Sequence, residues 1–197
     1  MRRGFRKAIG VTGGIGSGKS LALSFLRRWG YPVLSADEVG HRLLGRREIA
    51  QKVRRAFGPG VFTRGRVDRK KLAGSAFAGP GVLKRIDRIL HPAIRSEVGK
   101  WVKGKRRMGK GPLFVEVPLL FEARFEGLFD GVLSVSAPAA TRRRRVGQER
   151  FRERGPHQWS QARKDRCADW VVRNVSTRKR FERRLGVWVA EIKQGGI

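Results

Sequence analysis

The residues best suited to phosphate chemistry stand near the start of the chain, in the segment Gly13-Gly14-Ile15-Gly16-Ser17-Gly18-Lys19-Ser20. Glycine at this spacing lets backbone N–H groups turn inward around a phosphate, as in the P-loop. In that pattern Lys19 reaches the β- and γ-phosphates, and the Ser20 hydroxyl binds the Mg²⁺ that bridges them. The sequence therefore predicts ATP and Mg²⁺ as ligands, and the predicted ATP-binding residues are Gly13, Gly14, Ile15, Gly16, Ser17, Gly18, Lys19, Ser20 and, through its amide, Leu21.

The flanking segments support this prediction. Residues 7–12 form a short apolar run typical of a buried strand, and residues 21–26 have the apolar spacing of a helix. A dinucleotide-binding fold is the nearest rival, because Asp37 lies about twenty residues further on, where a ribose-binding acid would stand. That fold needs a third glycine at the position of Lys19, so the nucleoside triphosphate is favoured.

Length and composition limit the class of protein. A chain of 197 residues with 40% hydrophobic content can bury one core and carry an inserted subdomain. No apolar run is long enough to cross a membrane, and the basic start leads into a strand instead of a signal-peptide core. The single cysteine, Cys167, excludes an internal disulfide and is expected to be a small packing residue. We expect a cytoplasmic protein with no membrane partner; the sequence makes no prediction of oligomeric state.

The charge balance is unusual for an enzyme of this size. Lys and Arg number 46 against 16 Asp and Glu, which gives a formal net charge of +30. Such a field attracts nucleic acid without sequence preference and with strong salt dependence. The same charge is also typical of a solvated basic surface with no dedicated partner, and we favour this interpretation over a dedicated nucleic-acid role.

A carboxylate follows the second predicted strand, which lies within residues 29–37 and ends on Asp37. Ligands of open α/β sheets bind beyond the carboxyl ends of the strands, so Asp37 could take a proton from an attacking hydroxyl. It could instead be the N-cap of the helix that follows. Residues 38–110 are strongly basic with a mostly helical rhythm. The His91-Pro92 pair within them predicts a helix start, and His91 could be structural or catalytic.

Three further strands are predicted at residues 111–122, 130–136 and 170–172. Glu116 in the first of these could support Mg²⁺ binding or could be a hydrogen-bonded acid at a strand end. Strands alternating with helical stretches predict an α/β fold of the P-loop NTPase type, a doubly wound parallel sheet. A closing helix follows through Phe181, Leu185 and Ile192.

An arginine-rich segment, Thr141-Arg142-Arg143-Arg144-Arg145, follows the strand at 130–136. Guanidinium groups on a helix there suit a lid that neutralises charge on a transferring phosphoryl group. Four consecutive arginines cannot all face one site, so most of this run is expected to be surface or to contact RNA.

The order of the motifs resembles one family, dephospho-CoA kinase, over nearly the whole chain. The residues that carry the resemblance are Val11 to Ser20; Ala36-Asp37; Val67-Asp68-Arg69 with Leu72 and Phe77; Leu90-His91-Pro92; Val117-Pro118-Leu119-Leu120-Phe121-Glu122; Gln158 with Lys164; and Ala168-Asp169 ahead of Asn174. The glycine loop, the His-Pro pair and Pro-Leu-Leu-Phe-Glu in this order are a specific combination. Two departures stand out: Ser35-Ala36-Asp37 replaces the family's usual Asp-Ala-Asp, and the segment between Arg145 and Gln158 is shorter than usual.

The resemblance implies phosphorylation of the ribose 3′-hydroxyl of dephospho-CoA by ATP and Mg²⁺, the last step of coenzyme A synthesis. It implies a single kinase domain over residues 1–197, with an inserted helical substrate subdomain at 38–110 and an arginine-rich helical lid at 139–158. It makes Asp37, Lys19 and Arg145 the catalytic residues and Ser20 the metal ligand. The implied substrate-binding residues are Asp37, Arg69, His91 and Arg95, and Asn174 is placed on the adenine side of the ATP site. The alternatives are another nucleoside- or nucleotide-type kinase and a catalytically weak P-loop protein that binds nucleic acid.

Overall fold

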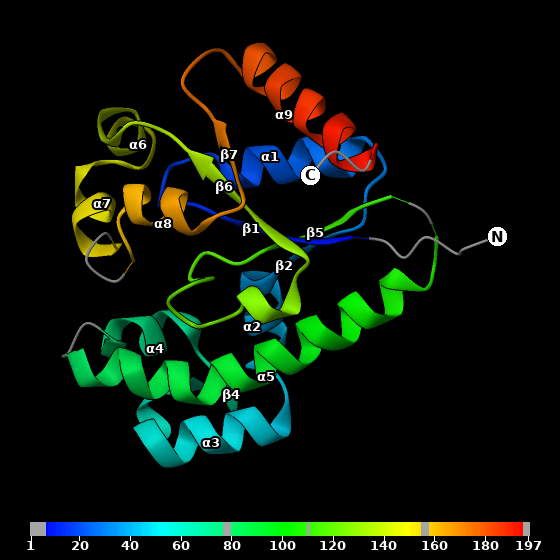
Figure 1. The fold of residues 1–197 in the computed structure, drawn as a ribbon. Coiled ribbons are helices and arrows are strands. Elements are labelled where there is room, and N and C mark those ends of the chain that lie inside the picture. Colours follow the sequence, from blue (N-terminus) through cyan, green and yellow to red (C-terminus); the bar gives the residue numbers. More distant parts are fainter. Residues whose placement is uncertain (1–6, 77–79, 110, 155–157, 195–197) are drawn as a thin grey trace. The chain divides into compact units, whose positions relative to one another are not determined.

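The computed structural model describes residues 7–76, 80–109, 111–154 and 158–194 (Figure 1). The chain divides into two compact units, Met1–Ser35 with Lys100–Ile197, and Ala36–Gly99. The first unit therefore comes from both ends of the chain, and the second is an insertion between two strands of the first. Some predictions fall outside the described residues. These are Phe77 of the family resemblance, residues 1–6 of the predicted domain, residue 110 of the predicted helical region and residues 155–157 of the predicted lid.

The first unit is built on a five-stranded sheet in the order β2-β5-β1-β6-β7, and all four pairings are parallel. The strands are β1 (Ala8–Thr12), β2 (Val33–Ser35), β5 (Leu113–Glu116), β6 (Gly131–Ser136) and β7 (Trp170–Arg173). Every residue of β1 and β5 is buried, as expected of strands covered on both faces. The predicted parallel sheet and its five strands are confirmed.

The carboxyl ends of the strands lie at one edge of this sheet, because all strands run in the same direction. Thr12 pairs with Ser134, and Ser35 pairs with Glu116. The glycine loop that follows Thr12 therefore leaves the sheet at the same edge as the residues that follow β2, β5 and β6.

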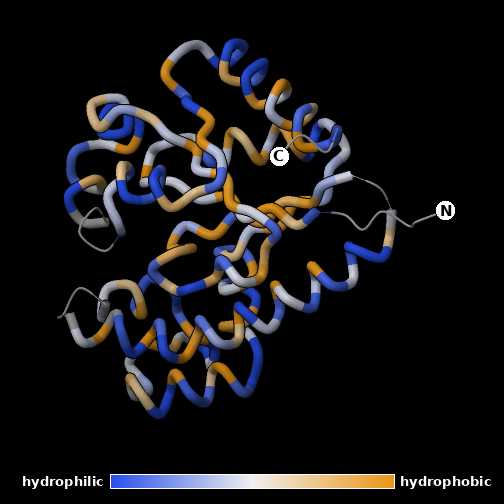
Figure 2. Tube along the Cα trace, viewed as in Figure 1, coloured by the Kyte–Doolittle hydropathy of each residue, from blue (hydrophilic) through white to orange (hydrophobic). Residues whose placement is uncertain are grey.

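One face of the sheet is covered by α1 (Lys19–Arg28) and α9 (Arg178–Lys193). Side chains of alternate strand residues, including Ile9, Val11 and Leu133, pack in one buried cluster with Phe25 of α1 and Phe181 of α9. Figure 2 shows hydrophobic and hydrophilic residues alternating along α9, as expected of a helix with one buried face. The predicted closing helix is confirmed.

The opposite face of β6 contacts α8 (Gln161–Cys167). Ser134 and Ser136 project there, between the residues that join the first core, and both donate hydrogen bonds to Asp165. Among its described residues this unit also contains η2 (Glu126–Leu128), α6 (Ala139–Val146), α7 (Gln148–Arg154) and the end of α5 (Pro80–Arg106). Helical segments on both faces make the sheet doubly wound.

The second unit contains α2 (Ala36–Leu43), α3 (Arg47–Phe57), η1 (Pro59–Val61), the hairpin of β3 (Phe62–Thr63) and β4 (Arg66–Val67), α4 (Arg69–Ala76), and most of α5 (Pro80–Arg106). The hairpin turn has positive φ at both central residues, Arg64 (49°) and Gly65 (77°), which is the geometry of a tight two-residue turn. A Cβ on Gly40 would lie 3.2 Å from Ile94 Cδ1, so α2 and α5 pack closely within this unit.

Two sequence expectations about local structure are wrong. The His91-Pro92 pair does not begin a helix, because α5 runs through Pro92. Proline removes one backbone hydrogen bond, which a helix of 27 residues with apolar residues on both sides of the proline can tolerate. Cys167 is exposed at the end of α8 and is not a packing residue.

Candidate functional site

The glycine loop joins β1 to α1 and forms a cradle of backbone amides. Gly13, Gly16 and Gly18 have φ values of 144°, 74° and 102°, and Gly18 is the left-handed N-cap of α1. The first N–H groups of a helix have no partner within the helix, and the helix dipole adds positive potential there. A loop of this shape at a helix N-terminus binds an anionic group such as phosphate.

Lys19, the first residue of α1, folds back over the loop. Its ammonium group donates to Gly13 O at 2.9 Å and Gly14 O at 3.1 Å, and the residue is only 9% exposed. The cation is therefore held at the mouth of the amide cradle, where phosphate oxygens would be its natural acceptors.

Ser20, the next residue, is exposed. Mg²⁺ in nucleotide sites takes few protein ligands and keeps waters and phosphate oxygens. One exposed hydroxyl beside the cradle fits this chemistry, whereas no group of three or more His, Cys, Asp or Glu side chains that could hold a metal occurs among the residues that the structure describes.

Two of the loop glycines are required by close packing. A Cβ on Gly18 would lie 2.1 Å from Asn174 Nδ2, and one on Gly16 would lie 2.6 Å from the Arg142 carbonyl oxygen. Positive φ is strained for any residue with a Cβ, so both positions need glycine on two counts. The loop is thus enclosed by α6 and by the residue that follows β7.

Asn174, the residue after β7, is hydrogen-bonded to the glycine loop. This residue is 2% exposed; its Nδ2 donates to Ser17 O at 2.9 Å, and its backbone N–H donates to Ser136 O at 2.7 Å. Asn174 therefore ties the loop to the ends of β6 and β7, while its predicted place beside adenine stays a prediction.

Two arginines of α6 reach the glycine loop. Arg145 donates to Gly16 O (3.2 Å) and Ser17 O (3.3 Å), and also to Asn174 O (3.3 Å) and Asn174 Oδ1 (3.2 Å). The structure thus brings the predicted lid arginine to the cradle, with its guanidinium on neutral carbonyl oxygens.

Arg142, which the sequence did not single out from the basic run, also lies against the loop. Its Nη1 lies 3.5 Å from Ile15 O in the loop, and its Nε donates to Ala137 O at 3.1 Å. The guanidinium also lies 5.1 Å from the centre of the Phe151 ring. Burial lowers the pKa of this guanidinium, and the charge of Asp165 partly opposes that shift. The spacing of Arg142 and Arg145, one helical turn apart, was the available signal that both would face one side.

Two glutamines bind backbone amides of the loop and were also missed in this role. Gln161 Oε1 accepts from the Gly14 N–H at 2.8 Å, and Gln158 Oε1 accepts from the Ile15 N–H at 3.1 Å. Neither side chain belongs to the P-loop pattern, so no motif pointed to Gln161. Only its spacing of four residues from Asp165 indicated that the two share a helix face.

The segment after β5 is fixed by a buried ion pair. Lys164 has a side chain that is 0% exposed, and its ammonium lies 2.9 Å from Glu122 Oε1 and 2.6 Å from Pro118 O. Glu122 Oε1 also accepts from the Trp159 N–H at 2.7 Å, and the Trp159 ring stacks on Phe121 at 5.9 Å. The Pro-Leu-Leu-Phe-Glu segment and α8 are therefore locked together.

Glu116 ends β5 in a buried position. Ser35 Oγ donates to Glu116 Oε2 at 3.3 Å. The structure thus shows the hydrogen bond expected of a strand-end acid, and a contribution to Mg²⁺ binding stays a prediction.

Asp37 lies in the second unit, in the first turn of α2, and is exposed. The N-cap interpretation is wrong, because β2 runs directly into a helix that begins at Ala36. A carboxylate in a first turn interacts favourably with the helix dipole without capping it.

The predicted substrate-binding residues Arg69, His91 and Arg95 also belong to the second unit. Arg69 begins α4, whose first amides, those of Lys70 and Lys71, donate to Asp68 Oδ1. These hydrogen bonds and the one from Thr63 lower the pKa of Asp68. Arg69 lies 2.8 Å from His41 Nε2, and because arginine only donates, that nitrogen must be the acceptor.

The histidine of α5 pairs within its own helix. His91 Nε2 lies 3.3 Å from Asp87 Oδ1, one turn earlier, and both side chains are about one-third exposed, at 30% and 34%. Arg95 stands one turn later on the same helix. The spacing of four residues places His91 and Arg95 on one face of α5, and their role in substrate binding stays a prediction.

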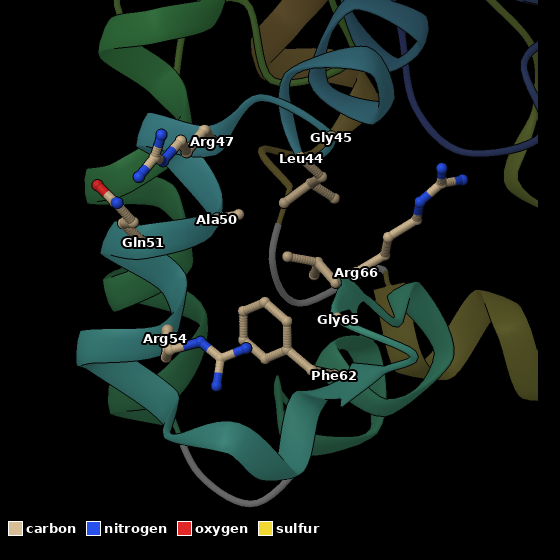
Figure 3. Close-up of a pocket in the computed structure, with 10 residues that line it drawn as sticks. Leu44, Gly45, Arg47, Ala50, Gln51, Arg54, Phe62, Gly65 and Arg66 are labelled. Atoms are coloured by element: carbon tan, nitrogen blue, oxygen red, sulfur yellow. The ribbon is translucent and has the colours of Figure 1, made fainter.

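A cavity of about 580 Å³ lies inside the second unit, between α3 and the β3–β4 hairpin (Figure 3). Arg54 stacks over the Phe62 ring at 4.2 Å, and Leu44 and Ala50 add apolar lining. Arg66 extends away from that ring in Figure 3. None of the predicted site residues lines this cavity.

No helix in the described part of the chain is both long and apolar enough to span a membrane.

Comparison with known proteins gives a consistent result. Residues 7–179 match the family model described as dephospho-CoA kinase. The dephospho-CoA kinase of Thermus thermophilus is 36% identical over 193 residues, which cover 95% of this chain and 92% of that protein. The dephospho-CoA kinase of Enterococcus faecalis is 30% identical over 193 residues, which cover 94% of this chain and 96% of that protein.

Solved structures agree. A Thermus thermophilus protein superposes with a TM-score of 0.77 at 36% identity, covering 96% of this chain and 99% of its own. The dephospho-CoA kinase from Campylobacter jejuni superposes with a TM-score of 0.76 at 25% identity, covering 96% and 98%. Shikimate kinase from Aquifex aeolicus, at 13% identity and a TM-score of 0.50, shares the fold alone.

Proposed function

We propose, since this chain belongs to the dephospho-CoA kinase family, that it transfers the γ-phosphoryl group of ATP to the ribose 3′-hydroxyl of dephospho-CoA, giving coenzyme A and ADP. The observation that carries the proposal is the amide cradle at the start of α1 with Lys19 folded over it. Kinases for other acceptors, and nucleic-acid binding without catalysis, are not favoured by family membership.

In the proposed reaction the 3′-oxygen attacks the γ-phosphorus. A bond forms between them, the bond from the γ-phosphorus to the β,γ-bridging oxygen breaks, and ADP leaves with its electron pair. Asp37 accepts the proton of the 3′-hydroxyl and orients that oxygen. The position of Asp37, two residues after the end of β2, supports this role, because ligands of such sheets bind beyond the carboxyl ends of the strands.

Charge stabilisation would come from Lys19 and Arg145. The transition state of phosphoryl transfer is loose, so positioning and electrostatics contribute most of the rate. Lys19 would exchange the carbonyl oxygens of Gly13 and Gly14 for the β- and γ-phosphates. Arg145, now on carbonyl oxygens of the loop, would likewise exchange them for the transferring group.

Mg²⁺ would be held by the Ser20 hydroxyl and, when bound, would neutralise charge on the β- and γ-phosphate oxygens. Glu116 would support the binding of this Mg²⁺ without being one of its direct ligands.

Dephospho-CoA would be held by the helical region at 38–110 through Arg69, His91 and Arg95, with residues 139–158 as the lid. These assignments follow the family resemblance, together with the positions of His91 and Arg95 on one face of α5. The Leu21 amide and Asn174 would complete the ATP site.

We place the reaction in the cytoplasm. ATP is supplied there, and a chain with a single cysteine has no internal disulfide that would need an oxidising compartment. The net charge of +30 would add weak, salt-sensitive affinity for nucleic acid without being the function.

The test is phosphorylation of dephospho-CoA by ATP and Mg²⁺, with adenosine and nucleoside monophosphates as competing acceptors. We expect product from dephospho-CoA alone. Lys19→Ala should abolish turnover, whereas Lys193→Ala, at the exposed end of α9, should leave it unchanged. Asp37→Asn should reduce kcat far more than ATP affinity, and a near-normal rate would remove Asp37 from the base role. Preferred transfer to another acceptor would overturn the proposal.

A further inference from the structure

The amide of Gly14, near the start of the glycine loop, is held by a side chain from outside the loop. The Gly14 N–H donates to Gln161 Oε1 at 2.8 Å, and Gln161 is 9% exposed. We propose that Gln161, oriented by Asp165, is a positioning residue that holds the P-loop in its phosphate-binding conformation before ATP arrives. This inference rests on the proposed function, because it names how this chain preorganises the same ATP site.

The orientation of the Gln161 amide is fixed by its neighbours. The nitrogen Nε2 lies 2.7 Å from Asp165 Oδ1, 3.1 Å from Ser134 Oγ and 3.4 Å from Val135 O. A carboxylate and a carbonyl only accept hydrogen bonds, so the donor nitrogen must face them. The oxygen Oε1 must then face Gly14.

Asp165 is in turn anchored to the sheet. Ser134 Oγ donates to Asp165 Oδ1 at 2.6 Å, and Ser136 Oγ donates to Asp165 Oδ2 at 2.7 Å. The two serines stand at alternate positions of β6 and so share one face. Gln161 and Asp165 are one turn apart on α8. The loop amide is thereby connected to a central strand through the side chains of Gln161 and Asp165.

Two later amides of the glycine loop are left available for a ligand. The N–H groups of Gly16 and Gly18 make no hydrogen bond within the described residues. A glycine-rich loop is otherwise free to adopt many conformations, and ordering it would weaken ATP binding. Fixing Gly14 from one side leaves the later amides directed to a ligand without occupying them.

The test is ATP affinity by isothermal titration calorimetry, with kcat and KM measured for both substrates. Gln161→Leu keeps the approximate size of the side chain and removes every hydrogen bond of its amide, including the one from the Gly14 N–H. We expect ATP affinity to fall about tenfold, with KM for ATP rising and KM for dephospho-CoA unchanged. Asp165→Ala should give a similar loss. Because the two residues act in series, the double variant should be no worse than Gln161→Leu alone.

A reversal of the hydrogen bond provides the rescue. Gln161→Glu sets two carboxylates against each other and should weaken ATP binding beyond Gln161→Leu. Adding Asp165→Asn supplies an amide donor to the new carboxylate and should restore most of the affinity.

Ser160→Ala is the matched control. Ser160 is the N-cap of α8, accepting from the Arg163 N–H at 3.2 Å, and this substitution weakens the helix without touching the loop. Affinity within twofold of the parent protein for Gln161→Leu would overturn the inference, as would an equal loss for Ser160→Ala or no rescue in the double variant.

Failure of the proposed function has a different signature. The unsubstituted chain would then bind ATP without phosphorylating dephospho-CoA, and the comparison of ATP affinities would still decide the role of Gln161.

Discussion

Neutralising Glu122 tests the buried ion pair that locks α8 to the segment after β5. Glu122→Gln keeps an oxygen to accept from the Trp159 N–H and removes only the negative charge that faces Lys164. The Lys164 side chain is 0% exposed, so its ammonium cannot recover water when its counter-charge is lost.

The magnitude follows from burial. Removing one partner of a buried pair costs about 3–5 kcal/mol, and the 14% exposure of Glu122 favours the lower end, about 3 kcal/mol. For a protein of this size that is a fall in Tm of roughly 6–12 °C. Glu182→Gln is the control in the same unit. The side chains of Glu182 and its partner Arg28 are 30% and 54% exposed, so this substitution should lower the free energy of unfolding by less than about 1 kcal/mol.

Tryptophan fluorescence during urea unfolding is the assay. The five tryptophans, at positions 29, 101, 159, 170 and 188, all belong to the first unit, so the signal reports the unit that holds the pair. A shifted midpoint with an unchanged slope identifies a change in stability.

The pH dependence provides a second measurement. Burial lowers the pKa of Lys164 below its ordinary value of 10.5, and Glu122 opposes that shift. The unfolded chain then binds this proton more readily, so this contribution to stability rises with pH up to about 10.5. The deficit of Glu122→Gln should therefore shrink as the pH is raised toward that value, and that of Glu182→Gln should not. A deficit no larger than that of Glu182→Gln, or one independent of pH, would show that Lys164 is not a buried cation stabilised by Glu122.

Three further outcomes are expected. Gly18→Ala should weaken ATP binding, measured by calorimetry, at least tenfold, because the new Cβ would lie 2.1 Å from Asn174 Nδ2 and the φ of residue 18 is 102°. Gly74→Ala is the control, because a Cβ added there meets no atom within 4 Å. Arg145→Ala should reduce kcat about 10³-fold, the lower end for a phosphoryl-stabilising arginine, in the coupled assay, and a loss below tenfold would contradict the role of Arg145. Binding to non-specific duplex DNA should fall by orders of magnitude between 50 and 200 mM salt in a titration, whereas salt-independent, sequence-selective binding would contradict purely electrostatic attraction.

The glycine loop and the parallel sheet could be predicted from the sequence because their signals are local. Glycine adopts the positive φ of Gly16 and Gly18 without strain, and a short, continuous apolar run such as residues 8–12 is typical of a strand with both faces buried. The same reasoning failed at Pro92, where the local preference for a helix start yielded to the length and packing of α5. It also failed at Cys167, whose burial depends on the face of α8 on which it stands.

The contacts that hold the loop in place depend on the tertiary structure. Gln161, Asn174 and Arg145 reach the loop from segments more than a hundred residues further along the chain. Hydrogen bonds at that separation leave no periodic pattern, because the sheet order that joins β1 to β6 and β6 to β7 creates them. The local sequence specifies which atoms can bind phosphate, whereas the fold brings together the side chains that hold those atoms in place.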